Sequence, residues 1–380
     1  MKVAFITFGC RLNRAESLDL EARYRAEGHS IVGEDAAPDL IIVRGCSVTA
    51  KAQRDCEKAI ARLREDHPAA EVRILGCLPE RDNGKPPAPP SKYVVPSGTS
   101  RAYLKVQDGC SGKCAFCIVP RFRGPPASEP FDELRARAES LMQSGYREIV
   151  LTGCNLALYR SGGRDFAAPL DSLAYMADGV ARIRIGSLEP GVECKSVLDA
   201  IAAHANICRF LHLSLQSGSD RVLKRMRRPY GIELAENLCD DARERLGNDL
   251  SLGADVITGF PGESGDDFAA TRDFLARHAF TNLHVFPFSE RPGTPAATMD
   301  GAVPRTVRIA RARELSAFEN TRREAFAQSF VGREVEVCVE RGGEHGWTEA
   351  YLPCKWKDSA ERRSLVRKRV VAVEGCTLLA

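Results

Sequence analysis

The sequence has little net charge and no long apolar segment. Its 54 basic and 51 acidic residues leave a formal charge of only +3, which excludes binding of nucleic acid through overall charge alone. No apolar run is long enough to cross a bilayer, and Arg11 and Arg14 interrupt the apolar start too early for a signal peptide. The shares of hydrophobic residues (44%) and charged residues (28%) exclude a disordered or fibrous chain. We therefore expect a globular cytoplasmic protein that does not associate with membranes.

Cysteine is abundant, with 14 residues in a chain of 380. Cytoplasmic thiols stay reduced, so these cysteines are expected to be metal ligands or core thiols rather than disulfides. The length predicts two or three domains.

Residues 1–80 have the pattern of a small α/β domain. Short apolar runs alternate with helical stretches, which predicts a flavodoxin-like βαβαβ unit with a parallel sheet. The runs lie at 2–8, 40–44 and 72–76, and the helical stretches lie at 15–27 and 49–66. Residues 81–100 are rich in proline, glycine and serine, which is typical of a linker.

Residues 101–330 contain six strand candidates separated by helical stretches. Six β-then-α units predict a partial (β/α)6 barrel, and an open doubly wound sheet is the alternative. A barrel of this kind would build its site at the carboxyl ends of the strands. The strand candidates lie at 102–107, 147–152, 182–187, 209–215, 252–258 and 282–287.

Residues 331–380 follow a charged helix at 305–329 and show alternating valines, which predicts a small all-β module. Within the module, the segment from Lys355 to Arg369 holds seven basic and two acidic residues. Such a run is either a solvated face or a local site for phosphates.

The strongest chemical motif is CxxxCxxC, formed by Cys110, Cys114 and Cys117 directly after the first predicted barrel strand. A 4Fe-4S cluster normally takes four thiolates, so three close cysteines leave one iron open. The amino and carboxylate groups of S-adenosylmethionine can chelate that iron, and one electron can then release a 5′-deoxyadenosyl radical. A zinc site with a distant fourth ligand is the alternative, although zinc prefers CxxC pairs.

Several residues at predicted strand ends are candidates for holding S-adenosylmethionine. Glycines there permit close backbone approach, and polar groups can hold the methionine and ribose parts. Phe116 can pack against the adenine, or it can be ordinary loop packing. The other candidates are Gly153, Asn155, Glu189, Gln216, Gly259 and Gly262.

The cysteine motif and several later blocks resemble the radical S-adenosylmethionine methylthiotransferases. The resemblance covers almost the whole chain, and the last block is most similar to the MtaB branch, which acts on N6-threonylcarbamoyladenosine beside the tRNA anticodon. The matching blocks are 108–124, 149–155, 184–190, 212–219, 255–263 and 284–294.

The resemblance implies a second 4Fe-4S cluster on Cys10, Cys46 and Cys77. Each of these cysteines follows a predicted strand of the first domain, so their positions also predict that they meet at one sheet edge. Packing is the alternative for these three. Cys154, at a predicted strand end, is more consistent with packing than with ligation.

The resemblance also implies the reaction and its partners. One S-adenosylmethionine would supply the methyl group and another the radical, and the methylthio group would be added to C2 of the adenine. The partners would be tRNA and an electron donor such as flavodoxin or ferredoxin. The module at 331–380 resembles the RNA-binding TRAM domain, in which Trp347 and Tyr351 would either stack on bases or lie in the core.

The chain departs from the family in three places that matter, one of which is Pro229 before Tyr230, where a basic residue is common. Only 32 residues separate Cys77 from Cys110, so the last βα unit of the first domain is expected to be missing or replaced by the linker. Arg44 and Gly45 precede Cys46 where Asn-Thr is usual. The alternatives are modification of isopentenyl-adenosine or of a ribosomal-protein aspartate, or a non-catalytic iron-sulfur RNA-binding protein.

Overall fold

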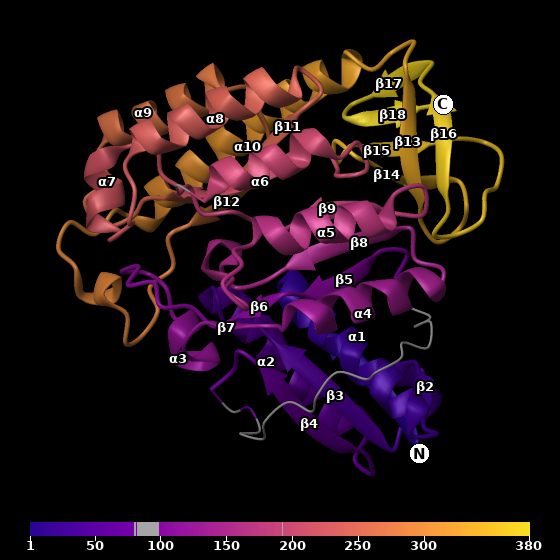
Figure 1. The fold of residues 1–380 in the computed structure, drawn as a ribbon. Coiled ribbons are helices and arrows are strands. Elements are labelled where there is room, and N and C mark those ends of the chain that lie inside the picture. The colour runs from indigo at the N-terminus through magenta and orange to yellow at the C-terminus, as the bar shows by residue number, and fades with distance from the viewer. Residues whose placement is uncertain (80, 82–98, 192) are drawn as a thin grey trace.

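The computed structural model describes residues 1–79, 81, 99–191 and 193–380, and its architecture is drawn in Figure 1. Most of the predicted linker, residues 82–98, lies outside the described residues. Within the described part of the chain, no helix is both long enough and apolar enough to span a membrane.

The first domain is a four-stranded parallel sheet in the order β2-β1-β3-β4. This is the order of the first four strands of a flavodoxin-like fold, so the predicted topology is confirmed. The short edge strand β2 was not predicted, because three residues carry too little apolar pattern. The elements are β1 (Lys2–Thr7), α1 (Arg11–Ala26), β2 (Ser30–Val32), β3 (Leu40–Gly45), α2 (Ala50–Asp66) and β4 (Glu71–Gly76).

The central domain has six parallel strands in two adjoining three-stranded sheets, β5-β8-β9 and β10-β11-β12. The backbone of Leu188 joins the two sheets, because it donates to His212 and accepts from Ser214, each at 2.8 Å. The prediction of a partial barrel is therefore confirmed, and the open doubly wound sheet is not. The strands are β5 (Ala102–Lys105), β8 (Glu148–Thr152), β9 (Arg182–Ile185), β10 (Phe210–Gln216), β11 (Ser251–Thr258) and β12 (Phe280–Pro287).

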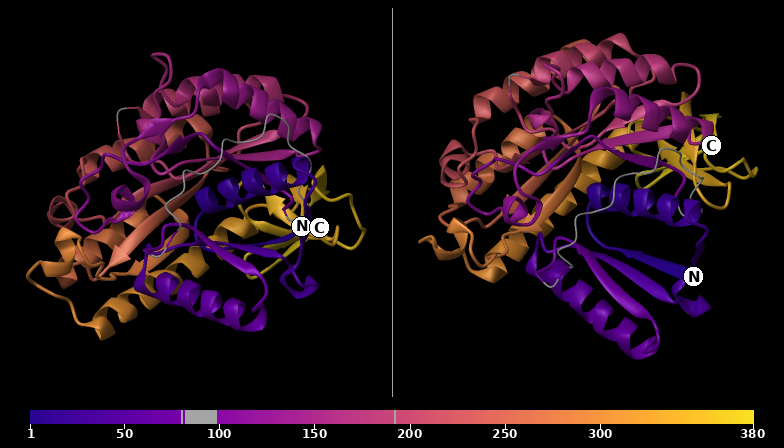
Figure 2. Two further views of the ribbon diagram at one scale, coloured as in Figure 1. Left: turned by 90° about the horizontal axis from the view of Figure 1, so that it is seen from below. Right: turned by 60° about the horizontal axis from the view of Figure 1, so that its bottom comes forward.

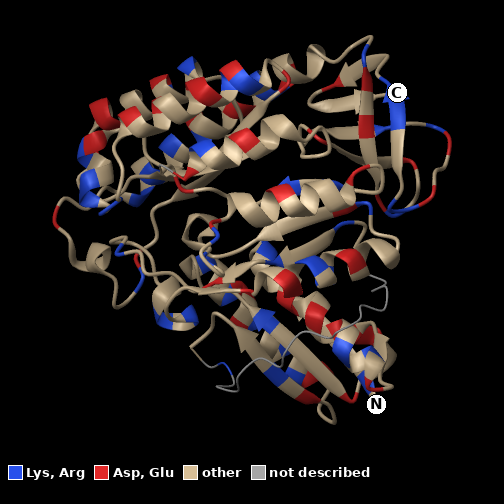
Figure 3. Cartoon of the chain, viewed as in Figure 1, with Lys and Arg blue, Asp and Glu red and all other residues tan. Residues whose placement is uncertain are grey.

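Helices cover the outer face of these strands (Figures 1 and 2). Their apolar sides share one large core with the strands, and acidic and basic residues both occur along the helices (Figure 3). The helices are α4 (Phe131–Gln143), α5 (Ala167–Ala177), α6 (Cys194–Ala203), α7 (Asp220–Arg225), α8 (Ile232–Leu246), α9 (Gly265–Arg277) and α10 (Arg305–Gln328). A short hairpin of β6 (Gln107–Asp108) and β7 (Ala127–Ser128) and the short helix α3 (Val119–Arg123) follow β5.

The last part of the chain is a mixed sheet in the order β16-β13-β14-β15-β18-β17, which confirms the predicted all-β module. It lies beside β9 and is drawn in yellow in Figure 1. The strands are β13 (Glu334–Val339), β14 (His345–Thr348), β15 (Pro353–Lys355), β16 (Leu365–Arg369), β17 (Ala372–Glu374) and β18 (Thr377–Leu379).

The module is fixed to the barrel by two buried arginines of β9. Arg182 and Arg184 both contact Glu148 of β8, with shortest distances of 2.5 and 2.8 Å. The remaining guanidinium N–H groups donate to backbone carbonyls of the module. These acceptors are Glu336 and Trp347 for Arg182, and Thr348 and Glu349 for Arg184.

Candidate functional site

Cys10, Cys46 and Cys77 follow the carboxyl ends of three adjacent strands, β1, β3 and β4. The backbone N–H of Cys77 donates to the carbonyl of Gly45 at 3.1 Å, which joins two of the three strand ends. The electrostatic influence of Cys10 and Cys77 on Cys46 agrees with this proximity. The predicted meeting of the three thiols at one sheet edge is therefore what the structure has.

A glycine stands directly before each of these cysteines. Gly9 and Gly76 both have φ of +89°, a left-handed conformation that side chains other than glycine rarely adopt. A Cβ on Gly9 would also lie 2.5 Å from Cβ of Cys46. The repeated Gly-Cys pair is thus a sequence signal for the site, because it turns the chain sharply and leaves room between the thiols.

Cys56 of α2 packs against the backbone of Cys46. Its sulfur accepts from the backbone N–H of Cys46 at 3.4 Å and lies 3.6 Å from the carbonyl oxygen of the same residue. These contacts support a structural role for Cys56.

Cys110, Cys114 and Cys117 lie in the loop between β6 and α3, beyond the carboxyl end of β5. A Cβ on Gly112 would lie 3.2 Å from Sγ of Cys110 and 3.7 Å from Sγ of Cys114, so these two sulfurs flank one glycine. The N–H of Cys117 donates to the carbonyl of Cys114 at 3.1 Å and closes the turn. The loop therefore gathers three thiols within a few residues.

Burial raises the pKa of Cys46 and of Cys117 to about 11, and it also raises the pKa of Cys77 and Cys110. At neutral pH these thiols are protonated in the metal-free protein. A metal that binds them must displace protons, which thiophilic iron does and weakly bound hard cations do not. Both cysteine sets therefore fit iron-sulfur clusters by donor type and by convergence.

Two predicted cofactor residues reach the cysteine loop. Asn155, after β8, donates to Glu189 at 3.3 Å, and Glu189 pairs with Arg228 at 2.5 Å. Arg228 in turn donates to Sγ of Cys114 at 3.0 Å. Asn155 and Glu189 follow strands β8 and β9, Arg228 lies in the turn after helix α7, and the three form one polar chain next to the loop.

The other predicted cofactor residues have packing contacts of their own. A Cβ added to Gly153 would lie about 3 Å from Gln107. A Cβ added to Gly259 would lie 2.3 Å from Arg308, and one added to Gly262 would lie 2.8 Å from Arg225. Gln216 ends β10 with φ of +68°. Phe116 packs edge-on against Phe260 with ring centroids 6.4 Å apart. Their roles toward S-adenosylmethionine stay predictions.

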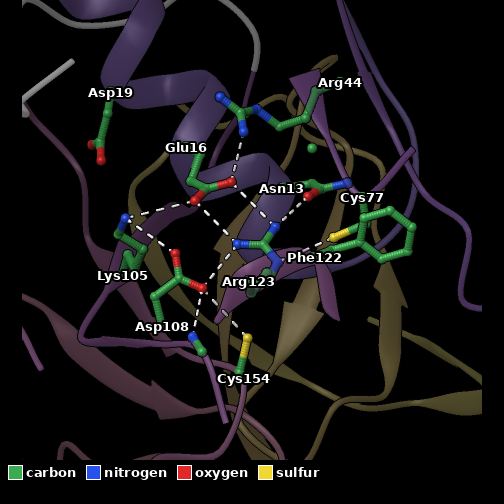
Figure 4. Close-up of polar contacts among 12 residues, drawn as sticks. Asn13, Glu16, Asp19, Arg44, Cys77, Lys105, Asp108, Phe122, Arg123 and Cys154 are labelled. Carbon is green, nitrogen blue, oxygen red and sulfur yellow. Dashed lines mark hydrogen bonds and ion pairs between the residues drawn. The ribbon is translucent and has the colours of Figure 1, made fainter. Parts of the chain in front are cut away.

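A buried polar cluster joins the two cysteine sites, and sequence reasoning missed it (Figure 4). Arg123 contacts Cys77, Asn13, Glu16 and Asp108, and its side chain is only 7% exposed. Its partners on the first domain are more than 100 positions away in sequence except for Cys77, so no local pattern could have revealed them. The thiol of Cys154 donates to Asp108 at 3.5 Å, consistent with its expected structural role.

His212, Asp255 and His284 lie together on the inner face of β10, β11 and β12. One carboxylate oxygen of Asp255 lies 3.2 Å from Nε2 of His212 and 3.1 Å from Nδ1 of His284. Nδ1 of His212 is buried without a partner among the described residues and faces Gly253. A carboxylate only accepts hydrogen bonds, so Nε2 of His212 and Nδ1 of His284 are the donors to Asp255, and the three residues form one hydrogen-bond network.

Trp347 and Tyr351 lie between the module and the barrel. Their rings stack on each other at 4.9 Å, and Tyr351 also stacks on Phe210 of β10 at 5.0 Å. The guanidinium of Arg184 lies 4.9 Å from the Tyr351 ring. Both side chains are half-buried at this interface, so their stacking on bases stays a prediction.

Comparison with protein families finds two matches. Residues 104–275 match the radical SAM superfamily, and residues 2–90 match the uncharacterized protein family UPF0004. The chain is 29% identical to the threonylcarbamoyladenosine tRNA methylthiotransferase MtaB of Bacillus subtilis over 94% of this chain and 91% of that protein. It is 31% identical to MtaB of Chlamydia pneumoniae, with 88% and 86% covered.

A similar likeness extends to a second group of relatives. The chain is 32% identical to the tRNA-2-methylthio-N(6)-dimethylallyladenosine synthase of Corynebacterium efficiens, covering 89% of this chain and 74% of that protein. Among solved structures, the radical S-adenosylmethionine methyltransferase TsrM of Kitasatospora setae has a TM-score of 0.58 at 15% identity, with 78% and 75% covered. That likeness shows the fold alone.

Proposed function

Because the chain belongs to the family of radical S-adenosylmethionine tRNA methylthiotransferases, we propose that it adds a methylthio group to C2 of N6-threonylcarbamoyladenosine in tRNA. The observation that carries this proposal is the presence of two separate three-cysteine sites joined by one buried polar cluster. A radical enzyme that only cleaves S-adenosylmethionine would need the barrel site alone, whereas insertion of sulfur calls for a second centre.

We assign the barrel cluster to Cys110, Cys114 and Cys117 and the second cluster to Cys10, Cys46 and Cys77. When bound, the two clusters and S-adenosylmethionine supply the electron, the 5′-deoxyadenosyl radical and the methylated sulfur. The protein's residues position these groups and exclude water. Three close cysteines suit a 4Fe-4S cluster with one open iron, whereas structural zinc normally takes four protein ligands.

We propose that Glu189, Asn155 and Arg228 orient S-adenosylmethionine beside the barrel cluster. The Glu189 carboxylate is an acceptor for an ammonium or for ribose hydroxyls, and Asn155 offers both a donor and an acceptor. Arg228 holds Glu189 and the Cys114 sulfur in one arrangement. This role follows from the shared contacts and not from any bound ligand.

Relatives named for dimethylallyladenosine have identities close to those named for threonylcarbamoyladenosine, so overall identity does not select the base. The block at 284–294 favours the threonylcarbamoyl branch. Modification of dimethylallyladenosine is therefore the second candidate. The reductant is expected to be a flavodoxin or a ferredoxin.

The test is to express the chain in a bacterial strain that lacks both methylthio modifications and to analyse digested tRNA by mass spectrometry. We expect the 2-methylthio form of N6-threonylcarbamoyladenosine to appear. Dimethylallyladenosine should remain without a methylthio group. Cys114→Ala should abolish the product, while Cys239→Ala, a change at a buried cysteine of α8 far from both motifs in sequence, should retain it. The methylthio form of dimethylallyladenosine alone would overturn the assignment of the base, and neither product would overturn the proposed activity.

A further inference from the structure

Arg123 links the first domain to the barrel domain beside both cysteine motifs. It ends the short helix α3 and lies six positions after Cys117 of the barrel motif. Its Nε donates to Sγ of Cys77 in the first domain at 3.2 Å. The dashed lines of Figure 4 show this guanidinium at the centre of the cluster, between helix α1 and the barrel loop.

All three guanidinium nitrogens of Arg123 have acceptors. Besides Cys77, they are Asp108 at 3.0 Å, Asn13 at 2.7 Å and both carboxylate oxygens of Glu16 at 3.1 and 3.2 Å. A planar guanidinium bound on every edge has one orientation only. The donor that faces Cys77 is therefore fixed in direction and cannot turn away to water.

The same contacts set the positions of the other two cysteines of the first domain. Asn13, which accepts from Arg123, donates to the carbonyls of Phe8 at 2.8 Å and Gly45 at 2.9 Å. These carbonyls lie two residues before Cys10 and one residue before Cys46. On the barrel side, Asp108 lies two residues before Cys110 and accepts from the N–H of Gly109 at 2.8 Å.

The guanidinium of Arg123 carries a positive charge. The guanidinium contacts the carboxylates of Glu16 and Asp108, and an arginine side chain stays protonated at any pH at which proteins fold. Arg44 at 2.7 Å and Lys105 at 3.6 Å also contact Glu16, so three cations face the two carboxylates of this cluster. An anionic, thiolate-bound group next to Cys77 would meet a permanent positive charge.

We propose that Arg123 is a positioning residue that holds the second cluster by its Cys77 ligand, raises the reduction potential of that cluster and fixes its distance from the barrel cluster. This inference rests on the proposed function, since it requires a cluster on Cys10, Cys46 and Cys77. N–H···S hydrogen bonds and nearby positive charge stabilise the more negative, reduced state of an iron-sulfur cluster. Arg123 supplies both from the barrel domain.

The test uses a full-length background protein in which Cys110, Cys114 and Cys117 are all alanine, so that only the second cluster can assemble. Its midpoint potential is measured by a redox titration followed by electron paramagnetic resonance, together with iron and sulfide content. Arg123→Gln should shift the potential to more negative values, because it removes the charge. Arg123→Lys should retain the charge and give a value between the two.

Arg121→Gln is the matched control. Arg121 lies in the same helix and is exposed, so this change removes the same charge without touching Cys77. The control should leave the potential unchanged. A potential that stays the same in Arg123→Gln with full cluster content, or that shifts equally in Arg121→Gln, would overturn the role of Arg123.

Loss of the cluster in Arg123→Gln with its retention in Arg123→Lys would support the positioning part of the proposal, and the lysine variant then reports the potential. Cluster loss in both variants, in proteins that keep the parent's circular dichroism spectrum, would support positioning and overturn the effect of charge. A background protein that assembles no cluster would overturn the second cluster itself. This last result is distinct from any result that concerns Arg123 alone.

Discussion

Arg228 donates a hydrogen bond to Sγ of Cys114 at 3.0 Å, just as Arg123 donates to Sγ of Cys77 at 3.2 Å. Each candidate cluster site therefore has one buried guanidinium on one of its three sulfurs. Arg228 is also tied to Glu189 on the cofactor side of its loop. Both arginines come from the barrel domain, so this domain contributes a positive charge to each site.

Cys114→Ala should abolish reductive cleavage of S-adenosylmethionine and leave the second cluster in place, because the two sites share no cysteine. Iron content should fall by about half, since one of two four-iron clusters is lost. The measurement is 5′-deoxyadenosine formed by reduced, reconstituted protein. A normal rate of its formation would show that the radical site lies elsewhere.

Cys46→Ala should stop methylthiolation but leave reductive cleavage of S-adenosylmethionine intact. The barrel site keeps its three ligands, so 5′-deoxyadenosine should still form, while the methylthio product should disappear. Both products are measured in one reaction with substrate tRNA. Cys56→Ala is the control, and it should lower stability but keep both products. Loss of both products in a folded variant that retains one cluster would contradict the division of labour.

The sequence alone predicted the parts of the fold that depend on local apolar pattern. All six barrel strands and the three longer strands of the first domain lie within a few residues of their predicted bounds, because each carries apolar residues in a short run or in alternation. The cysteine positions followed from those strand ends. β2 was missed because a three-residue edge strand has almost no pattern of its own.

Contacts between domains could not be predicted in this way. Arg123 meets Glu16 across 107 positions, and Arg182 meets the carbonyl of Trp347 across 165. No periodicity links such pairs. Similarly, the sequence leaves open whether an aromatic residue lies at a surface or an interface, and the rings of Trp347 and Tyr351 proved to lie at the interface.

Glu148→Gln should destabilise the junction between the barrel and the module. Glu148 is fully buried and is the anionic partner of Arg182 and Arg184, so the change leaves two buried cations without it. We expect a loss of about 3 to 5 kcal/mol in the free energy of unfolding. Urea denaturation measures it, and Glu65→Gln, at an exposed position of α2, should have little effect.

The stabilisation by Glu148 should also depend on pH. Burial would raise the pKa of Glu148, but Arg184 and Arg182 outweigh it and hold the pKa well below its usual value of 4.5. The stabilisation by ionised Glu148 is therefore present above pH 4.5 and is lost as the pH falls toward the lower folded-state pKa. The difference in unfolding free energy between the parent and Glu148→Gln should shrink as the pH falls from 7 to 3, and a constant difference would contradict this assignment.

The basic segment of the module remains the candidate surface for tRNA, although only part of it is available. Arg362 and Arg363 donate to Ser100 and to the carbonyl of Thr99, and Lys368 lies over the Trp356 ring. Four basic side chains of the segment are exposed and can meet phosphates. They are Lys355, Lys357, Arg367 and Arg369.

Changing these four residues together to glutamine should weaken tRNA binding and flatten its dependence on salt, because fewer phosphate contacts release fewer counterions. Four lost contacts would reduce the slope of log K against log salt by roughly 3. Filter binding at several salt concentrations measures the slope, and glutamine at Lys51, Arg54, Lys58 and Arg62 of α2 removes the same charge from another exposed surface. Equal losses in the two quadruple variants would show that binding depends on overall charge.

Trp347→Ala should lower the stability of the protein but leave the tRNA affinity of the folded fraction unchanged, because the Trp347 ring packs on Tyr351. A selective loss of tRNA affinity in Trp347→Ala would show instead that this ring stacks on a base.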